Sequence, residues 1–557
     1  MVSWRILDYF VVAGYLVLTA GLGAYFSKGN NTTEDFFLGS RGLPGWAVGF
    51  SLLSTTMSSV TFLAYPATSY ILDWRLYTKD FFYPVISVFT ALLVAPRFRK
   101  SLQSASVYEF LETRFGLECR LFGAATYVVS QLLKLCTTLY LMAVPISMLL
   151  DAPLPLVIIF TGAFVTCYSM AGGISAVVYT DVLQAIILLM GGAVSVIAIL
   201  VRVPGHTGAV AREANQHHKL SLGATEWSWE ERTMPTILAY SAVHYLTKFV
   251  TFQDAVQRYL AVPNHKVQQS TIGIAFPSPS VAGLLPDAVF PNFILHELPP
   301  GVAGVVISGV LAAAMSTMDS SLNATSSVVV IDFIQRCAWR DKTDRFYLRC
   351  ARAVSLAAAI FMISSALILE YVPMESLNEW YNSMQSILGG AVMSLFLIAL
   401  YAPWFTNASM LVAIVVSLLV NIFLMAGCME MLPPHGAFFG FFNELNSYWV
   451  APLVNLVFVL VAILAQLFLT TKWGREVLAW MNSQMLHVKG NKSTALGTEQ
   501  RRLLTATPPG SFRMYSDDNE AQNELSASVP GQHTSALHVE LSDAHNLLHP
   551  ASNVPSN

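Results

Sequence analysis

The chain has few charged residues, few cysteines and no excess of basic residues. Only 12% of its 557 residues are charged, whereas the wetted surface of a soluble protein requires about 25%. A chain this long with so little charge is not a soluble enzyme, a nucleic-acid-binding protein or a disordered scaffold. The net charge of −3 attracts no polyanion, so we expect no nucleic-acid partner. The six cysteines lack metal-ligand spacing, and we interpret them as packing residues.

Long apolar stretches take the place of charge. A helix needs about 20 mostly apolar residues to cross a bilayer core about 30 Å thick. Stretches of this kind lie at 7–26, 44–70, 79–96, 118–149, 154–170, 177–201, 234–257, 300–332, 350–372, 382–403, 408–428 and 447–470. They predict an all-α polytopic membrane protein with about 12–13 transmembrane helices. We expect one transmembrane domain over 1–473 and a disordered cytoplasmic tail over 474–557, where polar and acidic residues dominate.

The distribution of Lys and Arg between loops predicts the orientation. Basic residues gather after three of the apolar stretches, at Arg97, Arg99, Lys100, Arg114, Arg120, Arg258, Lys266, Arg336, Arg340, Lys342, Arg345, Arg349 and Arg352. The loops at 150–153, 373–379 and 429–446 contain neither Lys nor Arg. We therefore expect a multi-pass plasma-membrane protein with its N-terminus outside and its C-terminal tail in the cytoplasm.

The same rule exposes an inconsistency in the middle of the chain. The basic residues near Arg258 and near Arg336 should share one side, yet only the 300–332 stretch separates them. The intervening segment 270–290 is apolar but is interrupted by three prolines, so it is too short and too broken for an ordinary helix. Irregular backbone crosses a membrane only where protein shields it. Either a helix is missing or a degenerate crossing replaces it, and we favour the missing helix.

Hydroxyl side chains crowd one apolar stretch. Seven of the eleven residues from Ser51 to Thr61 are Ser or Thr, and Pro66 follows. Isolated hydroxyls in membrane helices satisfy backbone carbonyls or line close helix contacts. A cluster this dense, followed by a proline, favours an unwound helix centre, whose freed carbonyl and hydroxyl oxygens suit a hard cation such as Na⁺.

Two aspartates lie within or beside apolar stretches. Asp319 is near the middle of 300–332, where a carboxylate costs about 2.5–3.5 kcal/mol on insertion scales. It either forms hydrogen bonds with a neighbouring helix or belongs to a functional site. Asp181 follows the Gly172–Gly173 break, where it either stabilises a helix N-terminus or completes a cation site with Asp319.

Cationic side chains also occur inside the predicted spans. Lys134 lies halfway along 118–149, too deep for its ammonium to snorkel to the membrane surface. It either binds an anion or forms an internal ion pair. His244 and Lys248 are spaced i, i+4 in another stretch, and Lys248 has the same two interpretations.

Four segments stand out in order along the chain: EDFFLGSRGLPGWAVG at 34–49, GGISAVVYTDVLQ at 172–184, VQRYLAV at 256–262 and AAAMSTMDSSLNA at 312–324. Together they resemble the sodium:solute symporter family, or solute carrier family 5. The resemblance implies a leucine-transporter-type core of two inverted five-helix repeats, preceded by one extra N-terminal helix. It also implies Na⁺-coupled secondary active transport of a small organic solute by alternating access. We expect no enzyme activity, no cofactor and no metal other than Na⁺ as coupling ion.

The resemblance also implies where Na⁺ binds. The family's common sodium site falls on the backbone carbonyls of Ser54, Met57 and Ala313 and on the hydroxyls of Ser316 and Thr317. A second sodium site, present in some members, falls on Asp181, Asp319 and Ser320.

For the solute, the resemblance indicates only a chemical class. SSVTFLAYPATSYILDW at 58–74 is more similar to the sialic-acid branch than to the glucose branch. By that resemblance Thr56, Ser58 and Thr61 contact a substrate carboxylate, and Lys134 aligns with a carboxylate-binding arginine. Lysine keeps the charge but loses the bidentate fork, so we expect an organic anion, either a monocarboxylate or a sialic-acid-like acid.

The family has a full seventh helix after VQRYLAV, and this chain has too few residues there for one. The alternative function is therefore a non-transporting truncated isoform or a membrane sensor that binds without cycling. The expected partners are Na⁺, a small solute and the lipid bilayer.

Overall fold

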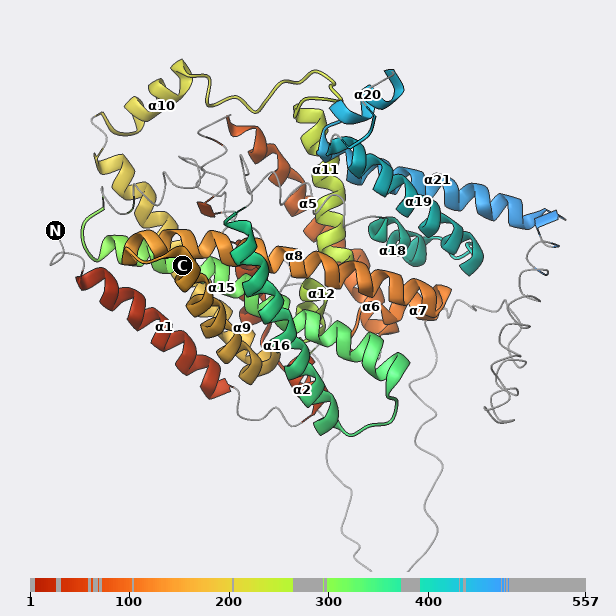
Figure 1. The fold of residues 1–557 in the computed structure, drawn as a ribbon, viewed down its shortest axis with the longest axis horizontal. Coiled ribbons are helices and arrows are strands. Elements are labelled where there is room, and N and C mark those ends of the chain that lie inside the picture. The colour runs from red at the N-terminus through yellow and green to blue at the C-terminus, as the bar shows by residue number, and fades with distance from the viewer. Residues whose placement is uncertain are drawn as a thin grey trace, which may run out of the picture. The chain divides into compact units, whose positions relative to one another are not determined.

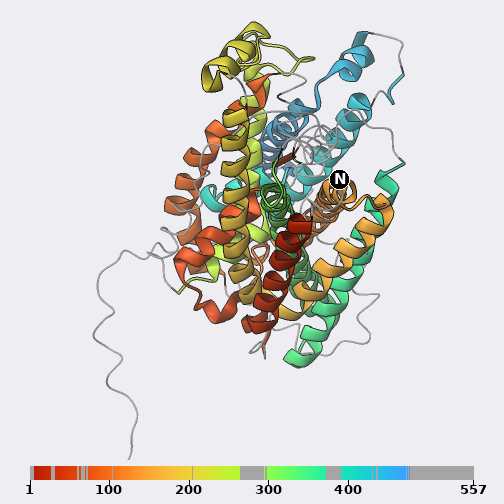
Figure 2. The same ribbon diagram turned by 90° about the vertical axis from the view of Figure 1, so that its left-hand side faces the viewer.

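In the computed structural model of this chain, the residues described are 6–26, 32–58, 62–63, 69, 73–102, 105–202, 205–263, 294, 298–371, 391–429, 431–433, 437–471, 473–474, 476 and 479. All regular secondary structure in these residues is helical, which confirms the predicted all-α class. Figures 1 and 2 show the helices from two directions. The segment 264–293, which includes the predicted missing or degenerate crossing, lies outside the described residues, as does Thr61.

The helices of the first half of the chain are α1 (Ile6–Phe26), α2 (Thr33–Leu38), η2 (Gly39–Arg41), α3 (Gly45–Thr56), η4 (Trp74–Phe81), α5 (Phe82–Phe89), η5 (Thr90–Val94), α6 (Ala95–Ser101), α7 (Glu109–Phe115), α8 (Leu117–Leu150), α9 (Leu154–Arg202), α10 (His206–Gln216), α11 (Met234–Leu246), η6 (Thr247–Thr251) and α12 (Gln253–Leu260). Those of the second half are α15 (Val302–Val328), η7 (Val329–Ala338), α16 (Asp344–Leu369), α18 (Val392–Tyr401), α19 (Asn407–Cys428), α20 (Ala437–Glu444), η8 (Ser447–Trp449) and α21 (Val450–Thr470).

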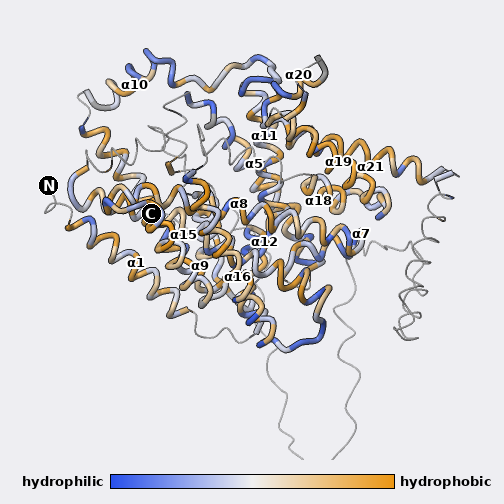
Figure 3. Tube along the Cα trace, viewed as in Figure 1, coloured by the Kyte–Doolittle hydropathy of each residue, from blue (hydrophilic) through white to orange (hydrophobic). Residues whose placement is uncertain are grey.

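Most of these helices coincide with the predicted apolar stretches. Within the described residues, 8 helices are long and apolar enough to cross a membrane, and two shorter apolar helices accompany them. Figure 3 shows the hydrophobic colouring along α19 and α21, whereas α10 is hydrophilic. Large side chains such as Ile422 and Leu464 are more than half exposed on these helices, as expected of a surface that faces lipid.

Helix α9 contains two predicted spans joined at a kink. Gly173 has a φ of 58° inside this helix, a left-handed conformation that glycine adopts without a Cβ penalty. The break predicted at Gly172–Gly173 is therefore confirmed. It lies eight residues before Asp181, which is buried in the second half of α9.

Helix α15 is the central element of the bundle. It packs against α9, α8, α1, α16 and α3, and nearly all of its side chains are buried. A Cβ at Gly191 of α9 would lie 3.3 Å from Cα of Gly309, so these glycines let the two helices approach closely. At its N-terminus the carboxylate of Asp8 accepts hydrogen bonds from the backbone amides of Gly301 and Gly304, both at 2.7 Å. An anion at this end complements the helix dipole.

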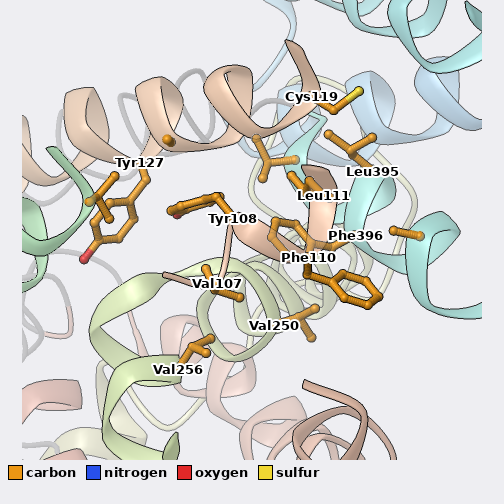
Figure 4. Packing of buried hydrophobic residues seen from close by; sticks show 14 of the residues in the cluster. Val107, Tyr108, Phe110, Leu111, Cys119, Tyr127, Val250, Val256, Leu395 and Phe396 are labelled. Carbon is orange, nitrogen blue, oxygen red and sulfur yellow. The ribbon is translucent and has the colours of Figure 1, made fainter. Parts of the chain in front are cut away.

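Aromatic side chains fix α12 against α8. Figure 4 shows Tyr108 and Tyr127 between these helices, in the largest hydrophobic cluster. The hydroxyl of Tyr108 donates to the carbonyl of Thr251 at 2.9 Å, and the amide of Asp254 donates to the hydroxyl of Tyr127 at 3.2 Å. These contacts hold the start of α12 beside the middle of α8.

Some of the basic residues counted for the orientation make contacts with neighbouring elements. Arg336 of η7 forms an ion pair with Glu112 of α7, and Arg99 of α6 donates to the carbonyl of Val262 at 2.8 Å. Two residues that we counted as loop charges are instead buried. Arg120 pairs with Asp332 at 2.6 Å, and Arg258 lies inside α12. Their use as loop charges was wrong, because each has a buried carboxylate partner that offsets its desolvation.

Candidate sodium and solute site

The hydroxyl-rich segment is a broken helix, as predicted. Helix α3 ends at Thr56, and Met57 is extended, with φ −95° and ψ 116°. The amide of Met57 still donates to the carbonyl of Leu53, but the regular ladder stops there. A helix that stops inside the protein leaves its last carbonyl groups without helical partners, so they are available to a cation.

The residues predicted for the first sodium site come together where α3 ends beside α15. The hydroxyl of Ser316 donates to the carbonyl of Ser54 at 3.0 Å and to that of Ala313 at 3.2 Å. The hydroxyl of Thr317 donates to the same Ala313 carbonyl at 3.1 Å. These two carbonyl oxygens and two hydroxyl oxygens therefore lie close together. Met57, the remaining predicted residue, is the extended residue at which α3 ends.

These oxygens have the chemistry of a sodium site. They are neutral, buried and hard, and each hydroxyl can rotate its proton away to present a lone pair to a cation. The hydroxyl of Ser54 is also buried and has no hydrogen-bond partner among the described residues. The arrangement therefore fits a small monovalent cation that binds through oxygen alone.

The residues predicted for the second sodium site meet around a guanidinium. The carboxylate of Asp181 accepts from the hydroxyl of Ser51 at 2.5 Å and from Nη2 of Arg258 at 3.0 Å. Arg258 also donates to the hydroxyl of Ser320, which lies 3.4 Å from the carboxylate of Asp319. One carboxylate oxygen of Asp181, Oδ1, has no hydrogen-bond partner among the described residues.

Asp319 is held from the opposite side. The hydroxyl of Tyr168 on α9 donates to its Oδ2 at 3.1 Å. Asp181 and Asp319 therefore lie at the two ends of one polar chain that runs through Arg258 and Ser320. The two carboxylates share one guanidinium, so this group of buried side chains has a formal excess of one negative charge.

Of the predicted solute residues, the structure describes Thr56, Ser58 and Lys134. Lys134 is buried on α8 and forms an ion pair with Asp254 of α12 at 3.6 Å, which matches the internal-pairing interpretation. Thr56 donates to the carbonyl of Leu53 at 2.7 Å and also has a hydrogen bond with Tyr83 of α5. Ser58, after the break, is half-buried.

Three residues of this region escaped prediction as site residues. They are Tyr168, Asp254 and Arg258, whereas Ser51 belongs to the predicted hydroxyl cluster. Asp254 lies within the predicted span 234–257, so the rule that singled out Asp319 applies to it equally. Arg258 was interpreted from its position after that span, and a sequence pattern does not show that its side chain turns inward.

Known proteins are similar to this chain in sequence. The Sodium:solute symporter family matches residues 36–281 and 271–415. The sodium/sialic acid symporter SiaT of Proteus mirabilis is 30% identical over 439 residues, covering 74% of this chain and 88% of that protein. The sodium-coupled monocarboxylate transporter 1 of Homo sapiens is 26% identical, covering 77% of this chain and 74% of that protein.

A solved structure is also similar. The substrate-bound outward-open state of a Na⁺-coupled sialic acid symporter superposes with a TM-score of 0.75 at 26% identity. The superposition covers 83% of this chain and 98% of that chain. The helices that carry the candidate site therefore belong to a fold already solved in a substrate-bound transporter.

Proposed function

Since this chain belongs to the sodium:solute symporter family, we propose that it moves a small organic anion into the cell together with Na⁺. At the level of the family, it is a Na⁺-coupled secondary active transporter of the alternating-access type and not an enzyme. The identity of the solute, the residues that bind it and the orientation in the membrane are the parts that we propose.

The observation that carries the sodium part is the meeting of α3 and α15. Because Ser316 and Thr317 lie against the carbonyls of Ser54 and Ala313, one cation there would join a broken helix to the central helix. Its binding energy then depends on how these two helices are placed. This dependence is what couples an ion to a conformational change, since a ligand shifts an equilibrium only by its difference in affinity between states.

The anionic nature of the solute has two supports. The two relatives described above are named for sialic acid and for monocarboxylates, both of which carry a carboxylate. In this chain, Lys79 and Lys134 are buried, and a buried cation requires a compensating anion. We propose that Thr56, Ser58, Thr61 and Lys134 contribute to the solute site, and that Asp181, Asp319 and Ser320 form a second sodium site.

We further propose a plasma-membrane location with the N-terminus outside and the C-terminal tail in the cytoplasm. Exposed basic residues support this orientation, because Arg97 and Lys100 lie on the short helix α6, and Arg340 and Lys342 lie in the loop that follows η7. The lipid bilayer is then the permanent partner of the exposed apolar helix faces.

Uptake into proteoliposomes tests this function. We expect the full-length chain to concentrate a radiolabelled monocarboxylate or sialic acid when Na⁺ is higher outside. An equal K⁺ gradient should give no uptake, and unlabelled glucose should not compete. Binding of these acids without sodium-driven accumulation would instead favour the alternative of a non-transporting form, to which the short segment before α15 points.

A further inference from the structure

Four buried charges of alternating sign link the proposed sodium residues to the proposed solute residues. In order they are Asp181 of α9, Arg258 and Asp254 of α12, and Lys134 of α8, and we call them the charge relay. No residue of the four is more than 7% exposed, so water screens these charges weakly and each depends on its neighbours in the relay. One end of the relay is a proposed sodium ligand, and the other end is a proposed solute ligand.

Contacts join each member of the charge relay to the next. Nη2 of Arg258 donates to the carboxylate of Asp181 at 3.0 Å, and Nη1 donates to the backbone carbonyl of Asp254 at 2.7 Å. The carboxylate of Asp254 lies 3.6 Å from the ammonium of Lys134. Asp254 and Arg258 are spaced i, i+4 on α12, so their side chains share one face of this helix.

Asp254 is the member whose hydrogen bonding is least complete. A charge-assisted bond from an ammonium to a carboxylate is normally about 2.7–2.9 Å long, so the contact of 3.6 Å with Lys134 is loose. The other carboxylate oxygen, Oδ1, is buried and has no hydrogen-bond partner among the described residues. Asp254 therefore has an acceptor available for Arg258, which lies one helical turn away, as well as for Lys134.

Arg258 occupies groups that a second Na⁺ would need. Besides Asp181, its guanidinium donates to the hydroxyl of Ser320. Ser320 also contacts the hydroxyl of Thr55 at 3.1 Å and the carboxylate of Asp319 at 3.4 Å. These three contacts match the capacity of one hydroxyl, which is one proton and two lone pairs. Na⁺ therefore gains Ser320 as a ligand only when the guanidinium moves away.

We propose that the charge relay couples the second Na⁺ to the solute anion. Na⁺ bound at Asp181 weakens the attraction of that carboxylate for Arg258, whose guanidinium then turns to the carboxylate of Asp254. Asp254 in turn releases Lys134, and the freed ammonium binds the carboxylate of the solute. This inference deepens the proposed anion transport and rests on it, because it uses the proposed roles of Asp181 and Lys134.

Charge balance favours binding of both ligands together. Na⁺ alone or an anion alone changes the net charge of this buried region by one, whereas both together leave it unchanged. Because an uncompensated charge is costly to bury, each ligand favours the other. Coupling of this kind is reciprocal, so an anion at Lys134 strengthens Na⁺ binding at Asp181 by the same factor.

Removal of the Asp254 carboxylate tests the relay, because a purely structural role predicts the opposite result. Binding of lactate and of N-acetylneuraminate to the full-length chain in detergent is measured by isothermal titration calorimetry, in Na⁺ and in K⁺ at equal ionic strength. We expect Na⁺ to tighten binding to the native chain. In Asp254→Asn, Lys134 is free without Na⁺, so the affinity in K⁺ should rise by roughly tenfold and the effect of Na⁺ should shrink. A carboxylate that only supports the fold would weaken binding when it is lost.

Arg258→Lys cuts the relay in a second way. Lysine keeps a charge for Asp181, but its single ammonium lacks the second nitrogen that bonds to Asp254. The effect of Na⁺ should therefore shrink without a rise of affinity in K⁺. The matched control is Asp332→Asn, which removes another fully buried carboxylate, paired with Arg120 at 2.6 Å outside the relay, and should leave the effect of Na⁺ unchanged.

The outcomes separate the charge relay from the proposed function. An affinity in K⁺ that does not rise in Asp254→Asn overturns the relay, and so does an effect of Na⁺ in Arg258→Lys equal to that of the native chain. Both results leave sodium-dependent binding of the acids to the native chain in place. A native chain that binds neither acid in either salt contradicts the proposed anion transport, and the relay with it.

Discussion

The guanidinium of Arg258 on α12 lies 3.0 Å from the carboxylate of Asp181 on α9, and both side chains are at most 1% exposed. Removing one member of a buried ion pair destabilises the fold by about 3–5 kcal/mol, because the charge of the other member then stays buried without a partner. Asp181 is therefore an anchor for α12 as well as a proposed sodium ligand. A substitution of Asp181 therefore changes both the stability of the fold and the affinity for Na⁺. Unfolding and sodium-dependent uptake measure these two effects separately.

Asp181→Asn should reduce both stability and apparent Na⁺ affinity. The neutral amide leaves Arg258 unpaired, so we expect the free energy of unfolding to fall by about 3 kcal/mol. Asp181→Asn with Arg258→Gln removes both charges and should recover most of that loss. The Na⁺ concentration for half-maximal uptake should stay raised in the double variant. If sodium kinetics in the stable double variant match the native chain, Asp181 is not an ion ligand.

Ser316→Ala with Thr317→Ala should abolish sodium-coupled uptake at normal surface expression. The two hydroxyls lie against the carbonyls of Ser54 and Ala313, and without them the cation has only backbone oxygens left. The matched control is Ser326→Ala, which removes a hydroxyl that donates to the carbonyl of Asn323 within α15 and has no other hydrogen bond among the described residues. Uptake is compared in Na⁺ and K⁺. Coupling that survives in the double variant contradicts the proposed site.

Much of the fold follows from physical rules that act locally. Helix α8 coincides with an apolar stretch long enough to cross a bilayer, and the break in α3 coincides with the hydroxyl cluster before Pro66. The kink of α9 follows from Gly172 and Gly173, because glycine adopts a positive φ without strain. These features need no knowledge of distant contacts.

The contacts between site residues on different helices could not be predicted from local sequence patterns. Lys134 could be identified as a deep cation, but its pairing with Asp254 depends on how α8 packs against α12, 120 residues later in the chain. Arg258 follows an apolar stretch, and the positive-inside rule counts such residues without regard to where their side chains turn. Its burial results from Asp181 and Ser320 lying within reach on two other helices.

Lys134→Arg should preserve uptake better than Lys134→Gln. Arginine keeps the charge that compensates Asp254 at the α8–α12 contact, whereas glutamine leaves a buried carboxylate without a cation. Lys134→Gln with Asp254→Asn should then restore thermal stability, though not necessarily transport. Unfolding in detergent and initial uptake rates are the measurements. Equal losses in the arginine and glutamine variants would indicate that Lys134 serves packing and not charge.

Glu112 should make the stability of the fold depend on pH. Partial burial raises its pKa, but hydrogen bonds from Arg336 and Arg120 outweigh this and hold the pKa below its ordinary value of 4.5. A carboxyl whose pKa is lower in the folded state stabilises that state above its unfolded pKa, and this contribution is lost as the pH falls through the folded value.

We therefore expect Glu112→Gln to lower the melting temperature at neutral pH, where Glu112 is charged and paired with both arginines. The difference between variant and native chain should shrink as the pH falls below the ordinary value of 4.5 and through the lower pKa of the folded state, because the native carboxyl then becomes protonated too. Glu118→Gln, which removes a nearby acid at the start of α8, is the control and should show no such convergence. A difference in melting temperature that stays constant from neutral to acidic pH would mean that Glu112 acts by packing, and that its two ion pairs contribute nothing to holding η7 against α7 and α8.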